Sequence, residues 1–389
     1  MRVAIIGGGA AGFFTAIQLK EKFSDKVEVV IFEKSNKVLE KVRLSGGGRC
    51  NCSNTFENVR DLKEVYPRGH QLMKKALKRF GSKEVFQWFV AHGIDLKVED
   101  KGRVFPKSNN SMEIVNLFLH LANKYNIVIK TNTPINSLTG LKKFDAIVLA
   151  TGGYNNETLF KELESKGQKI KPFIPSLFSF NIEDEGLREL SGLVVKDAEI
   201  LLCSTKFKYK DDLLITHWGV SGPATLKLSS FGAEYLYNNH YQSELLINWS
   251  GKTYTQVQQI IEEKLITNAN KLIKNFNPLS LPNNLWEYLG AKALGKKFEN
   301  KVVSINQKDI NRITNILCSD KYFIKGRYKE KSEFVSCGGI ALEGIDTLTM
   351  ESKVIKNLYF VGEALDIDAI TGGFNLQATW TTASLCSIS

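Results

Sequence analysis

Residues 3–12 of the chain read Val-Ala-Ile-Ile-Gly-Gly-Gly-Ala-Ala-Gly, and this stretch decides the fold. The apolar run at residues 3–6 predicts a short buried strand, and the glycines that follow it predict a tight turn. Apolar residues then recur with helical spacing from Phe13 to Phe23, so the turn opens a helix. This order of strand, glycine turn and helix is that of the first βα unit of a Rossmann-type α/β domain.

Three of these glycines, Gly7, Gly9 and Gly12, have the spacing of a dinucleotide-binding fingerprint. Gly7 makes the turn, Gly9 lets the backbone approach a pyrophosphate, and Gly12 lets the helix pack on the strand. The helix N-terminus then presents free N–H groups and a partial positive charge to the phosphates. Glu33 follows a second apolar run, Val27–Phe32, at about the 20-residue distance from which an acid reaches the ribose hydroxyls. These residues predict an ADP-containing cofactor and leave FAD and NAD open.

A second glycine-rich stretch, Ser45–Asn51, follows Glu33 too soon for an ordinary crossover helix and another strand. Its three consecutive glycines expose amide N–H groups, and Arg49 carries a charge that can neutralise a pyrophosphate or an anion beside a flavin. We interpret the stretch as backbone that lies against a planar ligand. A surface loop without a ligand is the alternative interpretation.

The C-terminal region repeats the combination of strand, acid and helix start. Leu358–Val361 predicts a buried strand that leads into Gly362 and Glu363, and Gly372-Gly373 precedes a helix that continues through Leu385. The ribityl chain and isoalloxazine of FAD need such a late acid and a second helix N-terminus. A further strand at Phe144–Ala150 ends in small residues suited to pass close to the cofactor. These features favour FAD, and no second Gly-x-Gly-x-x-Gly after residue 33 indicates a separate nicotinamide domain.

Several motifs together resemble one family of bacterial flavoproteins. They are the Gly7–Gly12 fingerprint with Glu33, Ser45–Asn51, Gly102–Pro106, Ala150–Gly153, Thr216–Pro223, Cys337–Gly339, Met350–Lys353 and Gly362–Gln377. With these residues the chain resembles the NAD(P)/FAD-dependent oxidoreductase family that includes aminoacetone oxidase and bile-acid enone reductase (BaiN-like), within the glutathione-reductase-like FAD superfamily. The sequence departs from the family pattern at Ala369, where members usually have Gly, and at Cys52.

The resemblance implies an α/β fold in which a discontinuous Rossmann-type FAD-binding domain receives an inserted β-rich domain that carries a helical subdomain. The expected boundaries are residues 1–175 and 342–389 for the FAD-binding domain, 176–252 and 322–341 for the β-rich domain, and 253–321 for the helical subdomain. Local patterns agree, because residues 176–252 contain short alternating runs and the spacing from Tyr254 to Asp320 is helical.

The resemblance also implies a set of cofactor-binding residues. They are Gly7, Gly9, Ala10, Ala11, Gly12, Glu33, Lys34, Gly47, Gly48, Arg49, Cys50, Asn51, Ile135, Ala150, Thr151, Gly152, Gly153, Gly362, Glu363, Asp366, Gly372, Gly373, Asn375 and Leu376.

His217 and Cys50 are the candidates for chemistry beyond the cofactor. His217 lies between a strand-like run and a Gly-Val-Ser-Gly-Pro turn, where it can transfer a proton or contact a substrate; a structural role is the alternative. One residue separates Cys50 from Cys52, which suits neither a thioredoxin-type pair nor a zinc site, so no metal is predicted. Cys50 is therefore the weaker catalytic candidate, with a structural role beside the flavin as the alternative.

The charge raises the question of an acidic partner. The chain has 52 Lys and Arg against 41 Asp and Glu, a net charge of +11, but only ten of the basic residues are Arg. Arginine is the residue that reads phosphates and base edges by paired hydrogen bonds, so this composition argues against a nucleic-acid specialist. Alternating cations at Lys325, Arg327, Lys329 and Lys331 predict either a face for an anionic donor, an acidic substrate or RNA, or an edge strand protected by charge. The oligomeric state is not predicted.

The location expected from the sequence is the cytoplasm. Six scattered cysteines form no disulfide pattern, and Met1-Arg2 leads directly into a strand without a signal peptide. No apolar window approaches the roughly 18 residues of a membrane-spanning helix.

The sequence thus predicts an FAD-dependent oxidoreductase that transfers hydride between flavin and a small organic substrate. Two sources of electrons stay open: NAD(P)H that visits the flavin transiently, or a substrate that reduces the flavin directly, as in an amine oxidase. A third alternative, a flavin-containing nucleic-acid-binding or RNA-modifying protein, rests on the charge and on the kinship of FAD folds.

Overall fold

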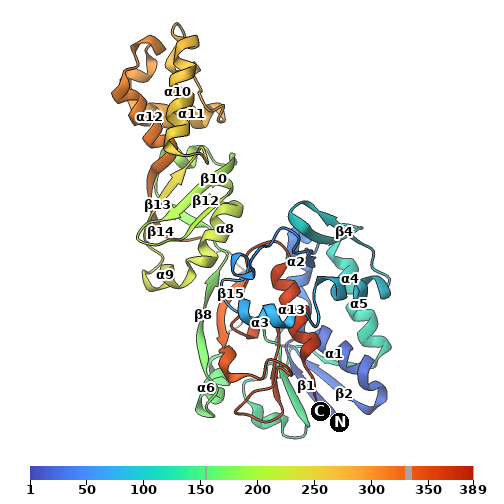
Figure 1. Ribbon diagram of the computed structural model, residues 1–389. Helices are drawn as coiled ribbons and strands as arrows, with labels where there is room; N and C mark the ends of the chain where they lie inside the picture. The colour runs from blue at the N-terminus through green and yellow to red at the C-terminus, as the bar shows by residue number, and fades with distance from the viewer. Residues whose placement is uncertain (154–155, 329–334, 389) are drawn as a thin grey trace. The chain divides into compact units, whose positions relative to one another are not determined.

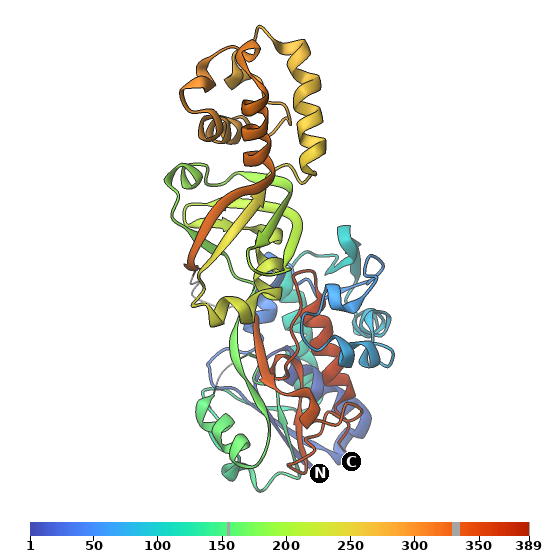
Figure 2. The same ribbon diagram turned by 60° about the vertical axis from the view of Figure 1, so that its left-hand side comes forward.

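A computed structural model describes residues 1–153, 156–328 and 335–388 of the chain. The chain forms two compact units (Figures 1 and 2). Unit 1 comprises Met1–Pro175 and Phe334–Ser389, and unit 2 comprises Ser176–Glu333. Unit 1 is therefore discontinuous in sequence.

Unit 1 contains a five-stranded parallel sheet in the order β16-β7-β1-β2-β6. Its strands are β1 (Arg2–Ile6), β2 (Glu28–Phe32), β6 (Val128–Lys130), β7 (Ala146–Leu149) and β16 (Leu358–Phe360). Val3, Ala4 and Ile5 in the central strand are fully buried, as expected for a parallel strand covered on both faces. The Rossmann-type sheet that the sequence predicts is confirmed, including its late strand from the C-terminal region.

Helices pack along this sheet around a cluster of aromatic rings. The main ones are α1 (Ala10–Phe23), α4 (Ser82–Ala91), α5 (Ser111–Lys124) and α13 (Phe374–Leu385). Phe14 of α1 lies 4.7 Å from the ring of Trp88 and 5.3 Å from that of Trp380, measured between centroids. Figure 1 shows α1 and α13 close together, although some 350 residues separate them in sequence. The two ends of the chain thus share one core.

Unit 1 contains further helices and strands outside this sheet. They are α2 (Glu40–Gly48), β3 (Ser53–Asn54), α3 (His70–Ala76), β4 (Leu96–Glu99), β5 (Arg103–Pro106), α6 (Glu157–Ser165), β8 (Ile170–Ser176) and β15 (Val335–Ile340). β8 leads toward unit 2, β15 returns from it, and these two strands pair with each other. The sequence assigned β15 to the inserted domain, within residues 322–341; this pairing places it in unit 1 instead.

Unit 2 contains a closed barrel in the order β10-β11-β12-β9-β14-β13. Its strands are β9 (Phe180–Ile182), β10 (Val194–Leu202), β11 (Lys208–Thr216), β12 (Gly219–Ser221), β13 (Ser243–Asn248) and β14 (Asp320–Arg327). Short helices α7 (Glu185–Glu189), α8 (Gly222–Phe231) and α9 (Ala233–Asn238) accompany them. Phe180, Ile200 and Leu245 are fully buried, so alternate strand residues fill the barrel.

Three helices are inserted between β13 and β14. They are α10 (Tyr254–Asn268), α11 (Asn283–Leu294) and α12 (Gln307–Ser319). They fall in the range 253–321 for which the sequence predicts a helical subdomain. Their apolar side chains continue the core of the barrel, for example Trp286 and Ile313. The barrel and the helices therefore form one compact unit, whereas the sequence predicted them as separate parts.

β14 is not the edge strand that its alternating lysines suggested. It pairs with β13 on one side and with β9 on the other, and its register with β9 shifts between Ile324 and Gly326. The shift leaves Lys325 as an extra residue, so Lys325 and Arg327 do not continue a simple alternation. Lys329 and Lys331 lie outside the described residues.

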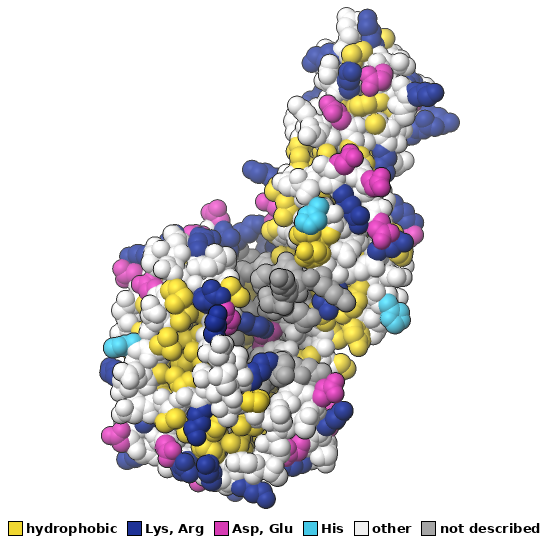
Figure 3. All heavy atoms as spheres, turned by 180° about the vertical axis from the view of Figure 1, so that it is seen from behind, with side chains coloured by type: hydrophobic (Ala, Val, Ile, Leu, Met, Phe, Trp, Pro, Cys, Tyr) yellow, Lys and Arg dark blue, Asp and Glu magenta, His cyan; other side chains and the backbone are white. Residues whose placement is uncertain are grey.

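Within residues 1–153, 156–328 and 335–388, none of the helices has the length and apolar composition that crossing a membrane requires. Lys and Arg side chains are spread over the face of the molecule in Figure 3 and do not gather in one patch there.

Candidate functional site

The glycine turn after β1 has the geometry that the fingerprint predicts. A Cβ atom on Gly7 would lie 2.2 Å from the carbonyl oxygen of Ala150, because the turn passes directly beside the end of β7. A Cβ on Gly12 would lie 2.0 Å from the carbonyl oxygen of Gly7. A Cβ on Gly9 would meet nothing within 4 Å. Two glycines are thus required by packing, and the third borders open space that a ligand can enter.

The N-terminus of α1 lies at this open space with its donors available. Gly9 caps the helix without a side-chain hydrogen bond, and the first turn contains no acid. In contrast, α5, α6, α10 and α12 are each capped by a side chain, respectively Asn110, Asn156, Thr253 and Asn306. The free N–H groups at Ala10 and Ala11, together with the helix dipole, suit a pyrophosphate.

Glu33, directly after β2, fixes the backbone of the glycine turn by hydrogen bonds. Its carboxylate accepts hydrogen bonds from the backbone N–H of Gly8 (2.8 Å) and of Ser35 (2.9 Å). Each carboxylate oxygen has two lone pairs, so ribose hydroxyls can still donate to it. Partial burial lowers the pKa of the neighbouring Lys34. Ile135 follows closely on Thr133, whose N–H donates to the Glu33 carbonyl oxygen (2.8 Å).

The glycines at the end of α2 form a loop that only glycine adopts readily. Gly46, Gly47 and Gly48 have φ values of 58°, 68° and 82°, in the left-handed region. Cβ atoms on Gly47 and Gly48 would meet nothing within 4 Å among the described residues. The loop therefore presents backbone, unobstructed by side chains, to the space in front of it. This is the surface that the sequence predicts for contact with a planar ligand.

Arg49 has partners within the protein. Its Nη1 pairs with both carboxylate oxygens of Glu99 (3.0 and 3.2 Å), and its guanidinium lies 4.1 Å from the centre of the Phe105 ring. These contacts anchor the glycine loop to the small sheet of β3, β4 and β5. Glu99 also pairs with Lys97 (2.9 Å), so two cations share this carboxylate. Neutralisation of a pyrophosphate or of an anion beside the flavin by Arg49 stays a prediction.

Asn51 connects the glycine loop to the C-terminal region, and Cys50 is buried beside it. In the orientation that satisfies both groups of its amide, Asn51 accepts a hydrogen bond from the N–H of Gly373 (3.1 Å) and donates to the carbonyl oxygen of Ser53 (3.2 Å). Cys50 is fully buried, and burial raises the pKa of its thiol to about 12. Such a thiol stays protonated at neutral pH, so this environment suits a structural role and not a nucleophile.

The C-terminal strand returns directly to the fingerprint. A Cβ on Gly362 would lie 2.8 Å from the Cβ of Ala11. The next residue, Glu363, pairs with Lys41 Nζ (2.8 Å) and accepts a hydrogen bond from the N–H of Ser336 (2.8 Å). A Cβ on Gly153 would lie 2.9 Å from the Glu363 carboxylate. The predicted Thr151-Gly152-Gly153 and Gly362-Glu363 motifs are thereby neighbours.

Asp366 carries a buried oxygen that points to a missing hydrogen-bond partner. The residue is 4% exposed; Oδ2 pairs with Lys171 Nζ (2.6 Å), while Oδ1 is buried without a partner in the described part of the chain. Buried carboxylate oxygens are nearly always hydrogen-bonded, so a ligand hydroxyl would satisfy Oδ1.

The N-terminus of α13 resembles that of α1. Gly373 precedes the helix with a φ of 91°, no side chain caps it, and its first turn contains no acid. The amide of Asn375 pairs at both ends with the backbone of Ala369 (2.9 and 2.8 Å), so its side chain fixes the preceding loop. Asn375 and Leu376 can therefore offer a cofactor their backbone N–H groups.

Apart from Ile135, unit 1 thus brings together the predicted cofactor residues from five stretches of the chain, residues 7–12, 33–34, 47–51, 150–153 and 362–376. Two helix N-termini without caps, open space at Gly9, Gly47 and Gly48, and an unpaired Asp366 oxygen fit a dinucleotide with a polyhydroxylated chain. FAD has these groups: a pyrophosphate, a ribityl chain and a planar ring that tolerates close backbone.

His217 belongs to unit 2 and stands in the turn between β11 and β12. Its side chain is exposed, and its ring lies edge-on to Trp218 at 4.4 Å between centroids. The local prediction of a loop position after a strand is confirmed, while every predicted cofactor residue lies in unit 1.

Two residues near the site were missed by the sequence analysis. Arg68 forms a two-point ion pair with the fully buried carboxylate of Asp368, in the loop before α13. His70, at the start of α3, has a buried Nδ1 without a partner among the described residues. Neither belongs to a recognisable motif, and the ion pair joins positions 300 residues apart, so no local pattern could reveal it.

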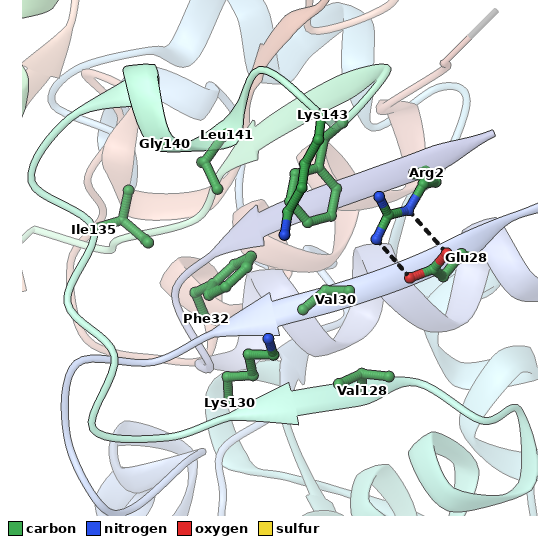
Figure 4. Close-up of a pocket in the computed structure, with 11 residues that line it drawn as sticks. Arg2, Glu28, Val30, Phe32, Val128, Lys130, Ile135, Gly140, Leu141 and Lys143 are labelled. Atoms are coloured by element: carbon green, nitrogen blue, oxygen red, sulfur yellow. Dashed lines mark hydrogen bonds and ion pairs between the residues drawn. The ribbon is translucent and has the colours of Figure 1, made fainter.

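A separate pocket of about 260 Å³ lies on the sheet (Figure 4). Val30 and Phe32 form its floor, and the connection that carries Ile135 and Leu141 passes over it. Of the predicted cofactor residues, Ile135 alone lines this pocket as described. The pocket is thus not the place where the glycine motifs meet.

Comparison with known proteins gives the class. The profile of the HI0933-like protein Rossmann domain matches residues 1–389, and the chain belongs to this family. It is therefore an enzyme of a family of FAD-dependent oxidoreductases, with a Rossmann-type flavin domain.

The curated relatives carry two kinds of name. The ribosomal RNA dihydrouridine synthase of Escherichia coli (strain K12) is 25% identical over 98% of this chain and 96% of its own length. The 3-dehydro-bile acid delta(4,6)-reductase of Clostridium scindens is 24% identical over 99% of this chain and 97% of its own. Among solved structures, 3-ketosteroid delta1-dehydrogenase from Sterolibacterium denitrificans is similar, with 13% identity, 98% of each chain covered and a TM-score of 0.48.

Proposed function

We propose that this protein reduces a carbon–carbon double bond conjugated to a carbonyl group, with FAD as the source of hydride. The observation that supports the cofactor is that unit 1 contains two helix N-termini without a side-chain cap, one beside Gly9 and one beside the Asn51 end of the glycine loop. The reaction rests on what the relatives' names share. Dihydrouridine arises when the C5–C6 double bond of uracil, conjugated to its C4 carbonyl, takes up two hydrogen atoms. A delta(4,6)-reductase of a 3-oxo steroid saturates bonds conjugated to the C3 carbonyl.

Different residues of unit 1 bind different parts of the cofactor. Gly9 and the N–H groups of Ala10 and Ala11 bind the pyrophosphate, and Glu33 binds the adenosine ribose. Asp366 Oδ1 accepts a hydrogen bond from the ribityl chain. The N-terminus of α13 stabilises negative charge that reduction places on the pyrimidine side of the ring. When bound and reduced by the donor, the flavin would supply a hydride to the carbon distal to the carbonyl and return to oxidised FAD; the protein or water would deliver a proton to the neighbouring carbon.

NAD(P)H that visits the site transiently is the electron donor that we propose. Saturation of a double bond consumes two electrons, and the substrate cannot supply them. A substrate-driven oxidase of the amine oxidase kind runs in the opposite direction and is the alternative. Since no second glycine fingerprint holds a nicotinamide nucleotide, the donor would dock on surfaces that the flavin site shares with the substrate.

Uracil in RNA is the second candidate substrate beside a small enone. It is favoured by the dihydrouridine synthases of Escherichia coli and Haemophilus influenzae, both 25% identical over nearly the whole chain, and by the net charge of +11. The excess of Lys over Arg favours the small molecule.

The test uses purified full-length protein. We expect it to be yellow, with FAD released on denaturation, and to be bleached anaerobically by NADH or NADPH. The reduced protein is then mixed with ribosomal RNA lacking dihydrouridine, or with a 3-oxo-4-ene steroid, and products are analysed by mass for the gain of two hydrogen atoms. Protein that cannot be reconstituted with FAD would refute the cofactor. Flavin reduced by an amine, and reoxidised by oxygen alone, would refute the direction of the reaction.

A further inference from the structure

The segment Val65–His70 contacts the loop Asp366–Gly373 along its length. The N–H of Ile370 donates to the carbonyl oxygen of Val65 (2.9 Å), and a Cβ on Gly69 would lie 2.6 Å from the side chain of Ile367. Arg68 and Asp368 also form an isolated antiparallel backbone bridge. The segment Val65–His70 thus lies antiparallel to the loop Asp366–Gly373, as a neighbouring strand would.

The centre of this contact is an ion pair buried at one end. The Asp368 side chain is 0% exposed and that of Arg68 is 11% exposed. Nε and Nη2 of Arg68 each donate to a different oxygen of Asp368, so the guanidinium fixes the direction of the carboxylate as well as its charge. Removing two charges from water is costly, and an apolar pair would stabilise the fold as well or better. The ion pair instead holds the loop Asp366–Gly373 in one conformation.

The loop Asp366–Gly373, which contains Asp368, leads into the N-terminus of α13. It begins at Asp366, whose Oδ1 lacks a partner in the described part of the chain, and ends at Gly373, which holds the Asn51 side chain. Ala369, next to Asp368, is held by the Asn375 amide. A shift of Asp368 therefore moves both the acid and the helix N-terminus that we assign to the flavin.

We propose that Arg68 is a positioning residue for the flavin. It acts through Asp368, holding the Asp366–Gly373 loop so that the α13 N-terminus and Asp366 meet the isoalloxazine and ribityl chain. This inference rests on the proposed function, because it assigns the loop to the cofactor. Lysine cannot replace Arg68 in this role, because an ammonium group lacks the planar fork that binds both carboxylate oxygens.

The test compares Arg68→Lys and the double variant Arg68→Met/Asp368→Leu with wild type. The double variant removes both charges, so it leaves no unpaired charge to unfold the protein. Arg2→Met is the matched control, because Arg2 also forms a two-point ion pair in unit 1, with Glu28, but at the surface of the sheet. Two quantities are measured: FAD affinity of the apoprotein, from flavin fluorescence, and hydrogen exchange at the Ile370 amide in the absence of FAD.

We expect FAD affinity to fall about tenfold or more in both Arg68 variants, equivalent to about 1.4 kcal/mol of binding free energy, because the loop is no longer held in one conformation. The Ile370 amide should exchange faster in both, and Arg2→Met should behave as wild type. Wild-type values in the double variant would overturn the proposal. So would weakened FAD binding with unchanged exchange at Ile370, because Arg68 would then act on FAD directly. If wild-type protein takes up no FAD, the proposed function fails, whereas the Ile370 exchange still reports on the Arg68 contact.

Discussion

The carbonyl oxygen of Gly7 occupies the space that a side chain on Gly12 would need, since a Cβ there would lie 2.0 Å from it. Gly9, between them, faces open space instead. Alanine at position 12 and alanine at position 9 should therefore have different consequences.

We expect Gly12→Ala to destabilise the protein by about 1–3 kcal/mol or more, because the backbone oxygen cannot move aside. Gly9→Ala should leave the melting temperature of the FAD-free protein unchanged and weaken FAD binding, because the new methyl group enters the space assigned to the pyrophosphate. Thermal melts of apoprotein and FAD titrations measure the two effects. Equal FAD affinity of Gly9→Ala and wild type would place the pyrophosphate elsewhere.

Cys50 should make the stability depend on alkaline pH. Burial raises the pKa of its thiol to about 12, whereas a thiol in the unfolded chain titrates near 8.5. Above pH 8.5 the thiol of the unfolded chain loses a proton that the folded chain keeps, and this favours unfolding. The free energy of unfolding is therefore unaffected by this thiol below pH 8.5, and above it falls by about 1.4 kcal/mol per pH unit until the folded thiol also ionises. Denaturant unfolding from pH 7 to 11 should show a smaller loss for Cys50→Ala. An identical slope in both proteins would contradict the burial of this thiol.

His70 and His217 are rival candidates for the proton that completes saturation of the double bond. His70 lies in unit 1 with a buried Nδ1 that lacks a described partner, and His217 is exposed in unit 2. Replacement of the true donor by Ala should slow oxidation of the reduced flavin by substrate roughly 100-fold, within the range for general acids, without loss of FAD. Stopped-flow absorbance measures this step. If neither variant is slowed, the proton comes from water.

The buried carboxylate of Asp320 should hold unit 2 together. It is 1% exposed and accepts hydrogen bonds from Trp249 Nε1 (3.0 Å), Tyr322 Oη (2.5 Å) and Lys292 Nζ (2.7 Å). Lys292→Met leaves this charge without its cation, and we expect unit 2 to lose about 3–5 kcal/mol. FAD content should be unchanged. Lys274→Met, which removes an exposed pair with Glu299, is the control for denaturant unfolding. Loss of FAD in Lys292→Met would show that the two units do not unfold independently.

The local structure that the sequence predicts correctly is encoded by local backbone requirements. Gly7 and Gly12 are needed because backbone oxygens approach them within the same βα unit or its neighbouring strand. The helices from Tyr254 to Ser319 follow from their apolar spacing in the same way.

What the sequence could not predict depends on pairings between distant residues. Arg49 meets Glu99, 50 positions away, and Arg68 meets Asp368, 300 positions away. β14 became an interior barrel strand because β9 and β13 both pair with it, which no alternation of lysines reveals. The same holds for β15, whose partner β8 ends some 160 residues before it.

Unit 2 interrupts the sequence of unit 1, and this order affects how the protein folds during synthesis. At a synthesis rate of about 5–20 residues per second, the roughly 160 residues of unit 2 take about 10–30 s to emerge from the ribosome. Throughout that interval the first part of unit 1 has β7 exposed where β16 will pair, and Phe14 of α1 lacks Trp380 of α13 beside it. We therefore expect the nascent chain to need protection from aggregation, and cofactor uptake to wait until the last helix is released. Bound flavin would then mark chains in which both parts of unit 1 have been made.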